Sequence, residues 1–448
     1  MSKQDTFART ALAAGAITAL AFTGSAPAQS SDALLNKLVD KGVLSTKEAE
    51  DLRKETQKDA EKGSSKMSPQ KSPLPDWVTS LKFYSDLRLR FEGIYANSGD
   101  FADRARFRYR MRPGFTAVLK DNFEVGVRLT SGEASGNFGG DPISGNTSLS
   151  DNGSKKFIYI DMAYGKWHAV KKDDWNLSFT GGKMENPLSF ASTDVFDHDY
   201  TPEGFAQEAS YRLNSNHVFK ATAVQYILDE VDTSGKDPAL VGGQLRWNAT
   251  WDKHWSSTLG GAYLSILNRD SLTTAAVPNQ GRGNTRNAAG ALVHGFNPYI
   301  GDAGLTYLFD SGPLYKGTFP VTVSGDYIYN PSAPNDNIGW SAGARLGKAG
   351  KKNTWQLDYR YTHLEADAWY EEFPESDFGA VYATAPVGGN NGYRSGTNVK
   401  GHWVKASYSP ADALTLSVAY FFTDLINPNP SGSDSGAGRL QVDLVWKF

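Results

Sequence analysis

From Trp77 onward, apolar and polar residues alternate along most of the chain. The alternation is clearest in residues 80–92, where every second side chain is apolar and the side chains between them are mostly charged. Such a period of two is typical of a β-strand with one apolar and one polar face. The apolar positions are Leu81, Phe83, Leu87, Leu89 and Phe91, and the charged ones are Lys82, Asp86, Arg88, Arg90 and Glu92.

The same pattern recurs along the chain and predicts about sixteen strands. Their predicted spans are 80–92, 103–119, 122–133, 155–168, 174–184, 204–213, 217–229, 240–251, 255–267, 298–310, 318–330, 337–348, 353–365, 397–409, 413–424 and 439–448.

Short polar connections alternate with long ones between these strands. The short connections are 120–122, 171–174, 214–216, 252–254, 348–352 and 409–412, and the long ones are 93–102, 134–154, 185–203, 230–239, 268–297, 366–396 and 425–438. Short turns at one rim and long loops at the other are typical of outer-membrane barrels. The predicted fold class is therefore all-β, a transmembrane antiparallel barrel of about sixteen strands, with both termini at the periplasmic rim.

Polar side chains occupy the predicted inner face of the barrel. Gln244, Arg246, Asn248 and Thr250 alternate along one strand, and a barrel of this size encloses an aqueous channel. The last strand ends on the aromatic Phe448, which we interpret as the C-terminal assembly signal of an outer-membrane barrel.

The N-terminus has the pattern of a secretory signal peptide. A basic start is followed by an apolar run too short to span a bilayer, and Ala26-Pro27-Ala28 predicts cleavage between Ala28 and Gln29. The predicted organisation is a signal peptide (1–28), a short α-helical periplasmic segment (29–62), a linker (63–76) and the barrel (77–448). The helices are interpreted either as a hairpin tethered at the rim or as a partner-docking element.

Composition excludes several classes of function. The chain has no cysteine and a formal net charge of −3, so we expect no disulfide and no nucleic-acid partner. No nucleophile elbow or phosphate-binding loop is present, so we expect neither an enzyme nor a cofactor. Asp197, His198 and Asp199 could attract a cation, but adjacent residues rarely converge on one ion, and we expect no metal.

The strongest local signal is a column of arginines at alternate positions of the predicted strand 103–119. Two interpretations remain open: a positive wall that conducts anions, or arginines that pair with Asp86, Glu92, Glu124 and a folded-in loop and order the lumen. The predicted pore-lining basic column comprises Arg88, Arg90, Arg104, Arg106, Arg108, Arg110, Arg112 and Arg128.

The connection 185–203 is the candidate constriction loop. We expect it to bend into the barrel and to place an acidic face opposite the arginine column. The alternative is an extracellular turn with ordinary solvated acids. The predicted constriction-loop acids are Asp194, Asp197, Asp199 and Glu203.

These features resemble the bacterial outer-membrane putative porin family. The resemblance rests on the helical N-terminus and linker, the arginine strand 104–112, Ile160-Asp-Met-Ala-Tyr164, the loop 197–204 and the aromatic C-terminus. It implies a barrel in outer-membrane lipid for passive diffusion of small hydrophilic or anionic solutes, and it allows a homotrimer. The alternative is a non-conducting barrel that acts as an adhesin, receptor or envelope anchor through the loops 268–297 and 366–396.

Overall fold

The computed structural model describes residues 74–448 except 100, 136–138, 234, 274–280 and 429–433. The predicted signal peptide, its cleavage site, the helical segment and the linker up to residue 73 therefore lie outside the described residues. The chain divides into two units, 1–78 and 79–448, and the second unit carries the barrel. Within the described residues, no helix has the length and apolar character needed to cross a membrane.

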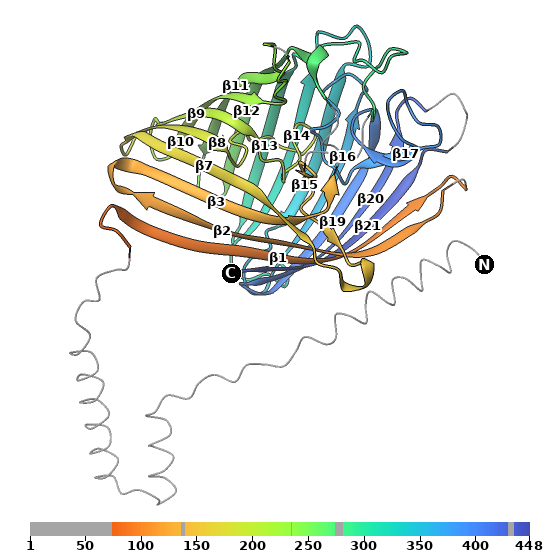
Figure 1. The fold of residues 1–448 in the computed structure, drawn as a ribbon. Coiled ribbons are helices and arrows are strands. Elements are labelled where there is room, and N and C mark those ends of the chain that lie inside the picture. Colours follow the sequence, from red (N-terminus) through yellow and green to blue (C-terminus); the bar gives the residue numbers. More distant parts are fainter. Residues whose placement is uncertain (1–73, 100, 136–138, 234, 274–280, 429–433) are drawn as a thin grey trace, which may run out of the picture. The chain divides into compact units, whose positions relative to one another are not determined.

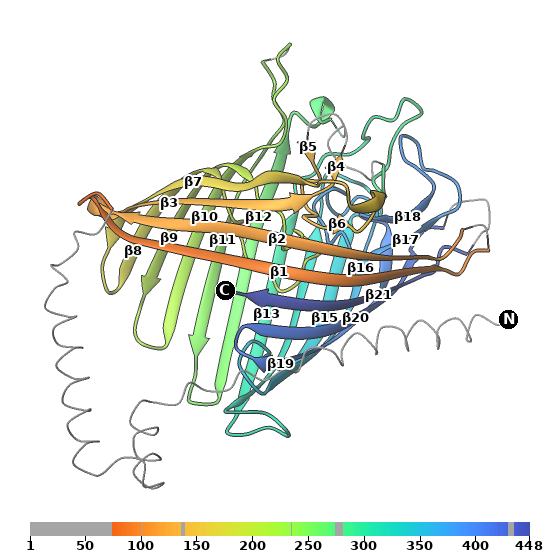
Figure 2. The same ribbon diagram turned by 60° about the horizontal axis from the view of Figure 1, so that its bottom comes forward.

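Sixteen antiparallel strands form a closed barrel (Figure 1). The first strand closes the barrel by pairing with the last, with Arg90 opposite Asp443, and the two lie side by side in Figure 2. The barrel strands are β1 (Val78–Ala96), β2 (Arg104–Leu119), β3 (Phe123–Gly132), β7 (Phe157–Lys171), β8 (Trp175–Lys183), β9 (Glu203–Arg212), β10 (His217–Ile227), β11 (Ala239–Thr250), β12 (Trp255–Leu267), β13 (Tyr299–Phe309), β14 (Phe319–Tyr329), β15 (Ile338–Gly347), β16 (Thr354–Leu364), β19 (Val399–Ala411), β20 (Leu414–Leu425) and β21 (Ala437–Lys447).

All sixteen predicted strands are confirmed, with ends that differ by a few residues. The loops contain additional short strands that a period of two cannot reveal over so few residues. They are β4 (Ala134–Ser135), β5 (Gly139–Gly140), β6 (Thr147–Ser148), β17 (Gly379–Tyr382) and β18 (Gly392–Ser395).

Short and long connections alternate along most of the chain and define two rims, with 310–318 at the short-turn rim as an exception. At the short-turn rim, Asp121 and Asn122 adopt left-handed backbone conformations with φ of 60° and 64°. Asp and Asn tolerate this conformation better than other side-chain-bearing residues, so they suit a tight reversal. We call the opposite end the long-loop rim.

The outer face of the barrel is apolar and aromatic. Ile160, Phe205 and Leu245 are exposed there, and Trp175 packs against Tyr211 with ring centroids 4.7 Å apart close to the short-turn rim. Aromatic side chains at such a level are typical of membrane–water interfaces. This face therefore suits contact with lipid.

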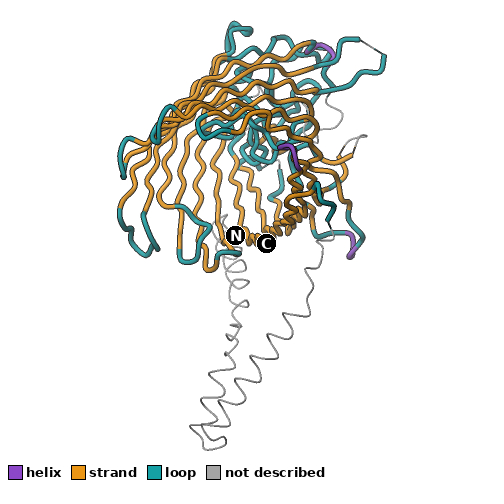
Figure 3. Tube along the Cα trace, turned by 90° about the vertical axis from the view of Figure 1, so that its left-hand side faces the viewer, coloured by secondary structure: helices purple, strands orange, loops and turns teal. Residues whose placement is uncertain are grey.

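The inner face differs from the prediction near the long-loop rim, where it is apolar instead of polar. Leu240, Leu264, Ile328 and Leu364 point inward and are almost completely buried. Loop segments inside the ring of strands cover them (Figure 3). We call the two principal segments, 184–202 and 365–382, the plug. Burying these side chains removes apolar surface from water, which stabilises the folded-in loops.

Candidate functional site

The arginine column lies on the inner wall of the barrel. Arg108 and Arg110 of β2 are buried, and Arg88 and Arg90 of β1 stand beside them. Arg104 is exposed at the start of β2, and Arg128 of β3 pairs with Asp161. The structure thus brings most of the predicted basic residues together on one wall, while Arg104 and Arg128 lie at its margins.

Glu92 lies at the centre of the part of this wall that is nearer to the long-loop rim. Its side chain is fully buried and accepts a hydrogen bond from Arg106. Arg108 Nη1 lies 3.6 Å from Glu92 Oε2, and Arg439 Nη2 donates to Glu92 Oε1 at 2.5 Å. Arg439 comes from β21 and was not among the predicted residues, because its partner is adjacent only after barrel closure.

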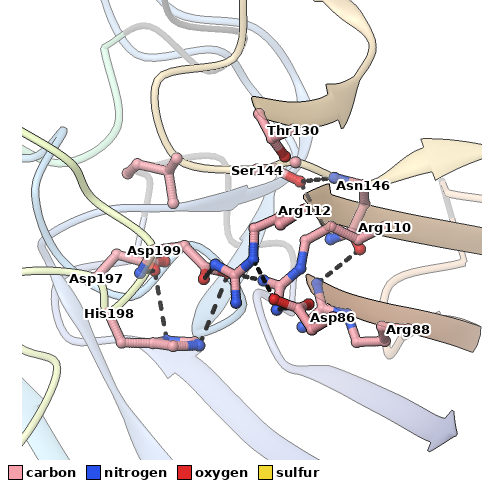
Figure 4. Close-up of polar contacts among 12 residues, drawn as sticks. Asp86, Arg88, Arg110, Arg112, Thr130, Ser144, Asn146, Asp197, His198 and Asp199 are labelled. Carbon is pink, nitrogen blue, oxygen red and sulfur yellow. Dashed lines mark hydrogen bonds and ion pairs between the residues drawn. The ribbon is translucent and has the colours of Figure 1, made fainter. Parts of the chain in front are cut away.

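A second ion-pair group joins the column to the loop 184–202 (Figure 4). Arg110 donates to Asp199 at 2.6 Å and to Asp86 at 3.2 Å. Arg112 donates to Asp86 at 2.8 Å and to Asp199 at 2.9 Å. The expected inward bend of this loop is therefore present in the structure, but Asp199 contacts the arginines directly instead of facing them across open water.

His198 lies among three carboxylates of the plug. Its ring nitrogens are 3.6 Å from Asp197, 3.7 Å from Asp199 and 3.8 Å from Glu375. Asp199 is the main reason why the pKa of His198 rises to about 9. Burial and Glu375 raise the pKa of Asp197 to about 8. Burial alone would raise the pKa of Asp199, but His198 and the two arginines hold it well below its usual value.

The same group bears on the question of a metal. Ligand atoms of Asp197, His198 and Asp199 lie within 4.8 Å of one another. The raised pKa of His198 favours its protonated form, which offers no lone pair to an ion, and Asp199 is already engaged by two arginines. An ion at this place would have to compete with these arginines and with the proton on His198.

The two remaining predicted loop acids differ in position. Asp194 is buried and accepts a hydrogen bond from Thr362 Oγ1 at 3.1 Å, and burial together with Asp326 raises its pKa to about 7. Glu203 is the first residue of β9 and pairs at 3.1 Å with Lys183, away from the column. Only three of the four predicted acids thus belong to the folded-in loop.

The segment 365–382 completes the plug and was not predicted to enter the barrel. Trp369 is fully buried and donates from Nε1 to the carbonyl oxygen of Val195 at 2.7 Å. Phe373 packs against Phe196 with ring centroids 5.2 Å apart. The sequence carried one usable signal, the concentration of aromatic residues in 369–382, which is unusual for a solvated loop.

A third loop fastens this segment. Glu371 has no exposed side-chain surface and accepts backbone N–H groups from Arg282 at 2.7 Å and Asn284 at 2.8 Å. Arg286 also pairs with it at 2.6 Å. The loop 268–298 therefore contacts the plug through the buried carboxylate of Glu371, which accepts hydrogen bonds from donors of that loop.

The main cavity of the lumen has a volume of about 540 Å³ and lies between the plug and the wall formed by β14–β16, β19–β21 and β1. Two of its carboxylates are occupied: Asp358 pairs with Arg345 at 2.6 Å and Asp443 with Arg90 at 2.7 Å. In the described part of the chain, no carboxylate lies within ion-pair distance of three further cations that line the cavity wall, Arg88, Arg360 and Lys405, although Asp358 stands opposite Lys405 on the neighbouring strand.

A second cavity of about 470 Å³ is lined by residues of β1, β2, β3, β7, β8 and β9 and by the start of the loop 184–202. Its charges are largely matched: Lys166 pairs with Glu208 at 2.8 Å, and Tyr164 donates to Glu124 at 2.9 Å. The main cavity therefore has more cations without an ion pair than this second cavity has.

Residues 95–281 match the model of the putative porin family. The match confirms the resemblance to that family. It covers the arginine strand and the constriction loop, and the strands in this range are part of the closed barrel. The chain is thus an outer-membrane channel protein of the porin type, and its strands lie in outer-membrane lipid. No curated protein matches the sequence.

The chain is similar to several solved porin structures. OprB of Pseudomonas putida is 12% identical with a TM-score of 0.50, and the alignment covers 82% of this chain and 94% of that chain. A mutant porin of Rh. blastica is 11% identical, with a TM-score of 0.41 and coverage of 82% and 100%. A loop-deletion mutant of OmpT from Vibrio cholerae is 12% identical, with a TM-score of 0.42 and coverage of 82% and 99%.

Proposed function

We propose that this porin forms a water-filled channel for passive diffusion of small hydrophilic solutes, with a preference for anions. The long loops face the outside of the cell, and both ends of the barrel chain lie on the periplasmic side. The single observation that carries the preference is the group of three cations, Arg88, Arg360 and Lys405, that line the main cavity without a carboxylate partner.

The proposal shifts the selective residues away from most of the arginine column. Arg110 and Arg112 are neutralised by Asp86 and Asp199, and Arg106 shares Glu92 with Arg108 and Arg439, so these arginines order the wall and the loop. A cation without an ion-pair partner contributes a larger positive electrostatic potential than a paired one does, and low-dielectric walls around a narrow space strengthen this potential. An anion passing through the cavity therefore gains electrostatic stabilisation that a cation does not.

The test is the reversal potential of the purified full chain in planar bilayers with a salt gradient. We expect open channels that prefer anions, and a reduced preference in the double variant Arg88→Gln/Lys405→Gln. Arg269→Gln is the control, because Arg269 lies in the loop 268–298 and already pairs with Asp270. An unchanged reversal potential in the double variant would reject these cations as the filter.

The plug supports one competing function, the non-conducting barrel that acts as an adhesin, receptor or anchor. A barrel with a sealed lumen would act through its long loops, for which the sequence predicted 268–297 and 366–396. Absence of current from correctly folded protein would favour this function over diffusion.

A further inference from the structure

The main cavity combines cations with aromatic rings on one wall. Arg360 lies directly opposite Trp403 of the neighbouring strand, and Trp403 lies directly opposite Phe421 of the next. Lys405 follows on the same strand and face as Trp403. Directly opposed side chains on neighbouring antiparallel strands stand roughly 5 Å apart, so this row places a positive group beside an aromatic surface.

The plug supplies an aromatic ring on the other side of the cavity. Phe190 of the loop 184–202 lines the space, and Phe378 of the segment 365–382 lines it next to Phe421, with ring centroids 6.4 Å apart. Phe190 and Trp403 are only partly buried, so their surfaces are accessible from the cavity. An apolar molecule between them would be covered on two sides.

The cations have unused donors. Arg88 is buried and donates to Asn146 Oδ1 at 2.7 Å, but its Nε has no partner in the described structure. Arg360 donates only to uncharged oxygens, which are the hydroxyl of Ser341 at 2.6 Å, the carbonyl of Ala191 at 2.7 Å and the hydroxyl of Ser324 at 2.9 Å. A guanidinium in such a setting can bind a carboxylate without first breaking an ion pair.

We infer that this cavity is a binding site for a small aromatic monocarboxylate, whose carboxylate lies among Arg88, Arg360 and Lys405 and whose ring packs between Trp403 and Phe190. The inference rests on the proposed channel and names the class of solute that it favours. The volume of about 540 Å³ lies within the range of roughly 300–1,000 Å³ that is usual for small-molecule sites.

Asp194 faces the same cavity and bears on its charge. Burial and the neighbouring Asp326 raise the pKa of Asp194 to about 7, so a large fraction of this carboxyl group is uncharged near neutral pH. It then repels an incoming carboxylate less than an ordinary aspartate would.

Benzoate serves as the probe. Its binding to the full chain in detergent is measured by calorimetry, and its interruption of single-channel current is measured in bilayers. Benzamide carries the ring without the negative charge, whereas acetate and inorganic phosphate carry negative charge without the ring. We expect benzoate to bind at least about tenfold more tightly than each of the three, a difference of about 1.4 kcal/mol. Equal binding of benzoate and acetate, or of benzoate and benzamide, would overturn the inference.

Two substitutions localise the site. Arg360→Gln and Trp403→Leu should each weaken benzoate binding about tenfold or more. Lys82→Gln removes a charge from the second cavity, and Trp251→Leu removes an indole that is 52% exposed, so both should leave benzoate affinity unchanged. Equal losses in the Lys82→Gln and Arg360→Gln proteins would show a general field instead of a site.

The two proposals fail in different ways. Current without benzoate binding would keep the channel and reject the site. Benzoate binding that Arg360→Gln and Trp403→Leu weaken, in a protein that passes no current, would keep the site and reject the channel.

Discussion

Truncation of Trp369 should open the lumen without unfolding the barrel. This side chain is fully buried in the plug, packs against Phe373 with ring centroids 5.6 Å apart, and donates to the carbonyl oxygen of Val195. Replacing a buried Trp with Ala usually costs about 3–5 kcal/mol. The lost hydrogen bond accounts for about 1 kcal/mol of that cost.

The loss falls mainly on the plug, because the barrel strands are held by their own closed ladder of hydrogen bonds. Since about 1.4 kcal/mol corresponds to a factor of ten, the ratio of packed to unpacked plug should fall by roughly a hundred- to several-thousand-fold in Trp369→Ala. We therefore expect larger or noisier single-channel currents and faster proteolysis within 365–398.

Two variants control this experiment. Trp369→Phe keeps an aromatic ring and loses the N–H donor, so its effect should be much smaller. Trp251→Ala removes an exposed indole whose N–H donates to Ser257, far from the plug in sequence and outside its packed cluster. A folded Trp369→Ala barrel with unchanged current and unchanged proteolysis would refute the idea that this packing controls the lumen.

Three further predictions concern charge, pH and backbone. Asp199→Asn should increase anion preference in reversal-potential measurements, because its two arginine partners lose a counter-charge while the side chain keeps its size; an unchanged potential would contradict this. The pKa of His198 is raised to about 9 and that of Asp197 to about 8, so the packed plug holds more protons than the unpacked loops. Packing of the plug should therefore weaken as the pH rises through 8–9, and single-channel current should become noisier. His198→Gln should remove the alkaline part of this change. Current noise that does not depend on pH would count against the cluster. Gly182→Ala should lower barrel stability by about 1–3 kcal/mol, because Gly182 has a φ of +117° and a Cβ there would lie 2.3 Å from a backbone oxygen of the neighbouring strand. Gly165→Ala, where no atom lies within 4 Å of the added Cβ, is the matched control in a heat-dependent gel-mobility assay.

The strands, their order and the alternation of turns could be predicted because each depends on local pattern. Period-two alternation identified every barrel strand, and residues such as Asp121 and Asn122 marked a tight reversal. The position of the arginine column followed from the same alternation, since side chains two residues apart share a face. The folding of the loop 184–202 into the lumen was expected from its resemblance to porin loops and its acids.

The pairing of those charges could not be predicted in the same way. Glu92 meets Arg439, and Arg90 meets Asp443, across 347 and 353 residues of sequence. These partners become adjacent only when the last strand closes onto the first, so the sequence shows which charges exist but not which of them are neutralised. Arg360 and Lys405 were not predicted as selective residues for the same reason, because an unpaired cation has no local signature.

The sequence by itself determined the barrel, its two faces and the wall that carries the arginines, because strand alternation and turn chemistry are short-range properties. Only the tertiary structure decided that 365–382 joins the constriction loop, that apolar inward side chains such as Leu264 and Ile328 are covered, and which cations remain without a counter-charge. The physical reason is that burial and ion pairing depend on which surfaces meet, and in a closed barrel those surfaces come from segments far apart in the chain.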